Sequence, residues 1–139
     1  MGSCSSKRVK PLDRGFSLVE LIVVVAILGV LAAVGVPMYL GYIDSARATD
    51  AQNGLRSIHL MQQEYNSDND EYYTTGEGDK TADINTNLFG GDETLNGEYY
   101  QFYIQQGDAA DGGYIACGED KVDSSKIYKI NAYNKTTNF

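Results

Sequence analysis

The chain has 139 residues and a formal net charge of −8, and this length fits a single domain. The charge is unevenly divided, because residues 1–15 carry four basic side chains against one acidic, whereas the remainder carries 7 basic and 18 acidic ones. An acidic remainder repels a phosphate backbone, so direct nucleic-acid binding by it is not expected.

The first predicted element is an apolar helix over residues 16–43. The stretch from Phe16 to Leu40 is apolar on every face, and no charged residue lies between Leu21 and Ile43. At about 1.5 Å per residue, residues 16–40 reach roughly 38 Å as a helix, which exceeds the roughly 30 Å of a bilayer core. The basic residues precede this helix and the acidic ones follow it, which predicts a cytoplasmic N-terminus and an exported head.

Glu20 is a carboxylate near the start of this apolar helix. An ionised glutamate costs about 2.5–3.5 kcal/mol at mid-bilayer and somewhat less near the edge, so it normally has a partner. A cut after Gly15 would give Phe16 a free amine, four residues before Glu20 on the same helix face. We therefore expect Glu20 to neutralise this amine in its own chain or in a neighbour. The alternative is an interfacial glutamate that reaches the headgroups.

The residues around this junction, Arg14-Gly15-Phe16-Ser17-Leu18-Val19-Glu20, resemble the type III signal of bacterial type IV pilins and pseudopilins. The resemblance covers about residues 14–50. It implies that a prepilin peptidase cleaves between Gly15 and Phe16 and methylates the Phe16 amine, and that Phe16 and Glu20 act in subunit assembly. Residues 1–15 would then be a leader peptide that is removed.

Pro37 stands where type IVa pilins commonly carry a proline. Proline removes an internal hydrogen bond and kinks or loosens the preceding turn. The resemblance implies that the helix between Gly29 and Pro37 can unwind in a filament, and Gly35 would make this change less costly. A tolerated proline in an ordinary spanning helix is the alternative.

The remaining residues, 44–139, are predicted to form a globular head. Ala51, Leu55 and Ile58 recur at spacings of three or four, which predicts an amphipathic helix over residues 44–66. His59, the sole histidine, is expected on the surface of this helix. Residues 67–97 are rich in Asp, Asn, Gly and Thr and predict a long ordered loop with one short turn around Ile84–Phe89.

Residues 98–133 predict an antiparallel meander, followed by a tail at 134–139. The strand signals are Glu98–Gln105, Tyr114–Cys117 and Lys126–Tyr133. The expected fold class is α+β: the pilin fold, in which a long N-terminal helix packs its C-terminal half on a small antiparallel sheet of three to four strands. Cys117, parted from Cys4 by the predicted cleavage, is expected to be a small buried residue within a strand.

No metal site, cofactor or catalytic set is expected. The acidic residues Asp68, Asp70 and Glu71 lack the spacing of a calcium loop and are interpreted as solvated surface charge. The sequence contains no recognisable nucleophile–base set, metal spacing or phosphate-binding glycine loop, so an enzyme is not expected.

The leading hypothesis is a type IVa major pilin, a subunit that polymerises with copies of itself into a surface filament for adhesion, twitching motility or DNA uptake. The resemblance implies three further partners: the prepilin peptidase, an inner-membrane assembly platform and an outer-membrane secretin. Before assembly the chain would reside in the bacterial inner membrane.

Four alternatives remain open. The first is a major pseudopilin of type II secretion or a minor pilin, and the second is an uncleaved, membrane-anchored binding protein with a single span. The third is a plain secretory signal cut near Ala32-Ala33. The fourth is lipid attachment at Gly2 and Cys4.

The cleavage hypothesis predicts the first residue of the assembled subunit. N-terminal sequencing of purified filaments should start at a methylated Phe16, because cleavage after Gly15 creates the amine that pairs with Glu20. Recovery of any residue before Phe16 on the mature subunit would sink this prediction.

Overall fold

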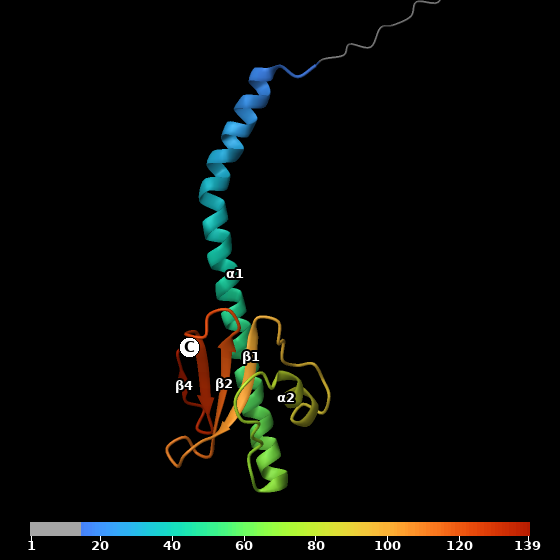
Figure 1. The fold of residues 1–139 in the computed structure, drawn as a ribbon, viewed down its shortest axis with the longest axis vertical. Coiled ribbons are helices and arrows are strands. Elements are labelled where there is room, and N and C mark those ends of the chain that lie inside the picture. The colour runs from blue at the N-terminus through green and yellow to red at the C-terminus, as the bar shows by residue number, and fades with distance from the viewer. Residues whose placement is uncertain (1–14) are drawn as a thin grey trace, which may run out of the picture. The chain divides into compact units, whose positions relative to one another are not determined.

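The structure is a computed structural model that describes residues 15–139. Of the predicted leader, only Gly15 is among these residues. The chain divides into two units, one ending at Gly41 and a compact head over Tyr42–Phe139. Helix α1 (Leu18–Asn69) contributes residues to both (Figure 1). The head adds five further elements: α2 (Thr81–Asn87), β1 (Tyr100–Gln106), β2 (Tyr114–Asp120), β3 (Ile127–Asn131) and β4 (Thr136–Thr137).

The first unit is the apolar stretch of α1, and its side chains contact no other part of the described chain closely enough to be buried. The most apolar window of α1 has a mean hydropathy of 2.8, and 0% of it is buried. By length and composition this is a helix that could cross a membrane. α1 passes through Pro37 without interruption.

The sheet is fully antiparallel, with its strands in the order β1-β2-β3-β4. Tyr103 of β1 is paired with Cys117 of β2, and Cys117 in turn with Lys129 of β3. This arrangement, with one long helix beside it, confirms the predicted α+β pilin fold. Cys117 is buried and its thiol is free, as expected.

Several element bounds differ from those predicted. α1 continues to Asn69 rather than to about Asn66, and the predicted turn is the helix α2, which begins earlier, at Thr81. β2 extends beyond Cys117 to Asp120. The predicted tail contains β4, whose Thr136 and Thr137 pair with β3. Two residues are too few to show an alternating pattern, so only the pairing reveals this strand.

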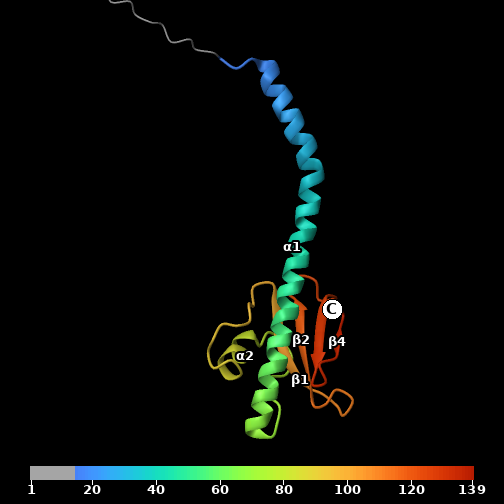
Figure 2. The same ribbon diagram turned by 180° about the vertical axis from the view of Figure 1, so that it is seen from behind.

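The core of the head lies between α1 and one face of the sheet (Figure 2), and α2 adds Ile84 to it. Phe102 of β1 occupies a space made by two glycines. A Cβ on Gly54 of α1 would approach the Phe102 ring to 3.2 Å, and one on Gly118 of β2 would also approach it to 3.2 Å. Glycine inside a helix or strand costs about 0.5–1 kcal/mol relative to alanine. Here its lack of a side chain lets Phe102 become 98% buried, as its 2% exposure shows.

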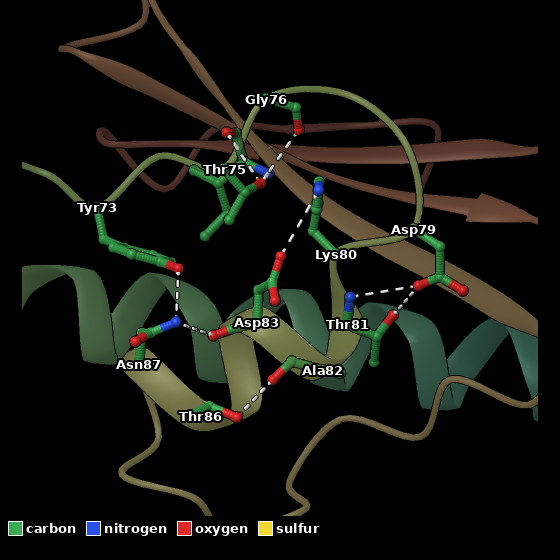
Figure 3. A network of polar contacts seen from close by, with 11 residues as sticks. Tyr73, Thr75, Gly76, Asp79, Lys80, Thr81, Ala82, Asp83, Thr86 and Asn87 are labelled. Carbon is green, nitrogen blue, oxygen red and sulfur yellow. Dashed lines mark hydrogen bonds and ion pairs between the residues drawn. The ribbon is translucent and has the colours of Figure 1, made fainter.

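The loop between α1 and β1 covers the outer edge of β1. Thr75 N–H donates to the Ile104 carbonyl (2.8 Å), and the Thr75 hydroxyl accepts from Ile104 N–H (2.9 Å). Thr81 makes a similar contact two residues earlier on β1, where its hydroxyl accepts from Phe102 N–H (3.1 Å). Figure 3 shows both threonines, with Asp79 accepting hydrogen bonds from Thr81. The covered edge is thereby kept from pairing with another chain.

Two amide side chains hold this loop to the helices. Gln62 of α1 is fully buried; its Nε2 donates to the Tyr73 carbonyl (2.6 Å) and its Oε1 accepts from Tyr73 N–H (2.9 Å). Asn85 of α2 makes the same two-point contact with the backbone of Leu95, at 3.1 and 3.0 Å. Each amide satisfies a backbone donor and acceptor that burial would otherwise leave without partners.

The Gln62 contact predicts a specific loss of stability. Gln62→Leu should lower the free energy of unfolding by about 1–3 kcal/mol, because it leaves the backbone N–H and carbonyl of Tyr73 without their hydrogen-bond partner. Urea denaturation of the detergent-solubilised chain, followed by circular dichroism, measures this. Gln52→Leu on the same helix is the matched control, since Gln52 is only partly buried, and equal midpoints for the two variants would contradict the prediction.

Candidate processing and assembly site

The N-terminus of α1 is capped by two reciprocal hydrogen bonds. Gly15, Phe16 and Ser17 precede the helix, which begins at Leu18. The Ser17 hydroxyl accepts from Glu20 N–H (3.2 Å), and Glu20 Oε2 accepts from Ser17 N–H (2.9 Å). This is a capping box, in which two amides that have no partner within the helix are satisfied by side chains.

Ser17 is a residue that the sequence reasoning missed. The serine followed three residues later by glutamate is itself a signal for a helix N-terminus, and it was present in the sequence. The carboxylate of Glu20 also lies in the first turn, where the helix dipole favours negative charge. In the uncut chain Glu20 therefore has a partner before any Phe16 amine exists.

The bond between Gly15 and Phe16 lies outside the helix. The Phe16 side chain is 83% exposed, and a Cβ built on Gly15 would meet nothing within 4 Å. Among the described residues, this bond is therefore exposed and free of packing. The structure thus brings the predicted cleavage bond and Glu20 to the same helix start.

Gly29, Gly35 and Pro37 lie apart from that helix start, along the apolar stretch of α1. Added Cβ atoms at Gly29 and Gly35 would meet nothing within 4 Å, so packing within the described chain does not require either glycine. Pro37 supplies no N–H to the carbonyl four residues earlier, which leaves that turn weaker than its neighbours. The predicted unwinding concerns a filament and stays a prediction.

His59 corrects one expectation. It is only 6% exposed, so its prediction as a surface residue is wrong. Its Nδ1 lies 2.7 Å from the Tyr114 hydroxyl, and its Nε2 lies 3.1 Å from Gln63 Nε2. The neutral tautomer with its proton on Nδ1 satisfies both contacts. Burial lowers the pKa of His59, although a hydrogen bond involving the Asn131 backbone partly offsets this.

A hollow of about 730 Å³ lies between α2 and the residues before β1, and its lining includes Asp79 and Glu93 but no histidine, cysteine or lysine. Between Gly15 and Phe139 no group of three or more His, Cys, Asp or Glu side chains is arranged to hold a metal ion. Burial raises the pKa of the Cys117 thiol, which disfavours the reactive thiolate.

Comparison with known proteins adds independent findings. Residues 10–36 match the family model described as the prokaryotic N-terminal methylation motif. The chain is 32% identical over 142 aligned residues to a fimbrial protein of Moraxella nonliquefaciens, covering 91% of this chain and 90% of that protein. No solved structure matches the chain significantly.

Two other relatives match slightly less than half of the chain. The type IV major pilin protein PilA of Myxococcus xanthus is 35% identical over 65 residues, which are 47% of this chain and 30% of that protein. The type II secretion system core protein G of Pseudomonas aeruginosa is 41% identical over 66 residues, which are 48% of this chain and 46% of that protein. The matches thus span less than half the length of these two relatives.

The buried His59 makes the stability of the head depend on pH. Because its pKa is lowered on folding, the unfolded chain binds a proton more readily than the folded one, so unfolding becomes easier as pH falls through the ordinary histidine range. Between about pH 7.5 and about pH 5.5 the parent should lose more stability than His59→Gln. Thermal unfolding at the two pH values measures this. Since His59 is the sole histidine, equal losses would contradict the assignment.

Proposed function

Because the chain belongs to the type IV pilin family, we propose that it is a structural pilus subunit, not an enzyme, that polymerises through its N-terminal helix into a surface filament. Support comes from the nearly full-length match to a fimbrial protein and from the methylation motif at residues 10–36. The filament would serve adhesion, twitching motility or DNA uptake. The acidic head itself would not bind nucleic acid directly.

The observation that carries this proposal is the uncovered apolar half of α1. Its large hydrophobic side chains between Leu18 and Leu40 are 51–75% exposed, although each such side chain gains about 1.5–3 kcal/mol when fully buried. A helix that is apolar all round needs an apolar environment. Lipid supplies it before assembly, with the N-terminus on the cytoplasmic side of the inner membrane, and helices of other copies supply it in the filament.

Processing links these two states. A prepilin peptidase cuts the exposed bond between Gly15 and Phe16, removes the basic leader and methylates the new amine. Ser17 N–H contacts Oε2 of Glu20, so Oε1 remains available for this amine, either in the same chain or in a neighbour. The capping box would keep the helix start formed while the charge is neutralised. Flexibility around Gly29, Gly35 and Pro37 would let the helix adjust during packing.

Partners follow from this proposal. Copies of the chain form the filament, the inner-membrane assembly platform extracts them, and an outer-membrane secretin passes the filament outward. A second candidate function is that of a major pseudopilin, and the 41% identity to core protein G of type II secretion, over 48% of this chain, favours it. Electron microscopy of sheared surface fibres separates the two, since long external filaments point to a pilus.

The proposal predicts separate effects for the charge and the cap. Glu20→Gln keeps an acceptor for Ser17 N–H but removes the charge that meets the Phe16 amine, so long filaments should disappear while the subunit remains in the membrane. Ser17→Ala removes one hydrogen bond of the cap and keeps the charge, so filaments should persist. Filament yield after shearing and subunit abundance by immunoblot measure both. Normal filaments from Glu20→Gln would refute the assembly role of Glu20.

A further inference from the structure

The hairpin between β2 and β3 lies against the first residues of α1 that belong to the head (Figure 1). Asp44 and Arg47 of α1 line a hollow of about 190 Å³ together with Val122 and neighbouring residues of this hairpin. Tyr99 joins the two parts: its ring lies 3.9 Å below the Arg47 guanidinium, and its carbonyl accepts from Lys121 N–H (3.0 Å). The hairpin is therefore fixed beside residues 44–47, which belong to the first turns of α1 within the head.

Val122, at the tip of this hairpin, is 96% exposed. The tip is nevertheless ordered by its own side chains. Asp120 accepts from the amides of Val122 (2.8 Å) and Asp123 (3.0 Å), and Asp123 accepts from the amide and hydroxyl of Ser125 (3.1 and 2.6 Å). A structured turn thus presents an aliphatic side chain outward, with these backbone amides already satisfied.

Chain connectivity places this tip close to any bilayer that the apolar stretch occupies. Tyr42, the first residue of the head, is 79% exposed, and Asp44 follows it by about 3 Å of helix rise. The polar layer of a bilayer is roughly 5–7 Å deep on each side. Residues packed beside Asp44 are therefore within reach of that layer, and tyrosines such as Tyr42 are enriched there.

We propose that the β2–β3 hairpin is a membrane-contact element, whose Val122 enters the headgroup layer of a phospholipid bilayer while the subunit awaits assembly. This inference rests on the membrane-held state in the proposed function. Charged groups of both signs surround the hollow: Arg47 and Lys126 against Asp44, Asp120 and Asp123. Attraction to anionic lipid is therefore not what holds the tip, and a zwitterionic surface suits it.

The contact would orient the head rather than anchor it. A salt bridge supports this role, because the Lys121 ammonium nitrogen of the hairpin lies 2.7 Å from an Asp79 carboxylate oxygen in the loop before α2. The tip is thus joined both to α1 and to the loop that covers β1, so a contact at Val122 constrains the whole head. Extraction into a filament would release it.

Site-directed fluorescence tests the contact. Single cysteines at Val122, Ala109 and Val30 are labelled with an environment-sensitive dye in the full chain carrying Cys4→Ser; Cys117 is fully buried and stays unlabelled. The labelled proteins are reconstituted in phosphatidylethanolamine–phosphatidylcholine vesicles that contain a nitroxide quencher near the headgroup. Ala109 is the matched control, since it is exposed in the loop between β1 and β2, at the opposite end of the sheet.

We expect the Val122 label to be quenched several times more strongly than the Ala109 label, and the Val30 label to be shielded from water. If Val30 is shielded but Val122 is quenched no more than Ala109, the hairpin contact is wrong and the membrane-held subunit stands. If Val30 is in water, both are wrong. Protection of Val122 only in assembled filaments would overturn the membrane contact and assign the tip to a second copy of the chain.

Discussion

The uncovered apolar surface of α1 is the constraint on which the other features of this chain depend. Between residues 18 and 41 the helix has no polar face and no partner within the described chain. Such a surface is stable in lipid or among other apolar helices, and it is costly in water. The charge distribution, the polar helix start and the acidic head all suit the proposed subunit, which moves from lipid into a filament of apolar helices.

The polar helix start resolves a conflict within that apolar segment. A carboxylate in hydrocarbon is expensive, yet the same carboxylate at a helix N-terminus completes a cap and meets the positive end of the dipole. Glu20 accepts from Ser17 N–H with one oxygen, which leaves the other for the Phe16 amine that cleavage would create. One side chain can therefore stabilise the helix before processing and carry a charge–charge contact after it.

The head contains a long segment between α1 and β1 that is rich in polar residues. The structure holds this loop with side chains that imitate strand pairing: the amides of Gln62 and Asn85 and the hydroxyls of Thr75 and Thr81 each bond to backbone groups. The two threonine contacts cover the free edge of β1, which in a polymer of identical chains would otherwise offer an unwanted site for strand pairing. The same segment adds Ile84, Leu88 and Leu95 to the apolar core that α1 and the sheet form.

The sequence by itself determined the features that depend on neighbouring residues. The apolar span, the leader charge, the Gly15–Phe16 junction with Glu20, and the alternation around Phe102 are all local patterns, and they predicted the long helix and three of the strands. Only the tertiary structure decided β4, the burial of His59 against Tyr114, and the loop contacts of Gln62 and Thr75. Each of these joins residues at least six positions apart through a hydrogen bond. A polar side chain that bonds to a distant backbone group looks the same in the sequence as one that faces water, so burial of this kind follows from the fold and not from local pattern.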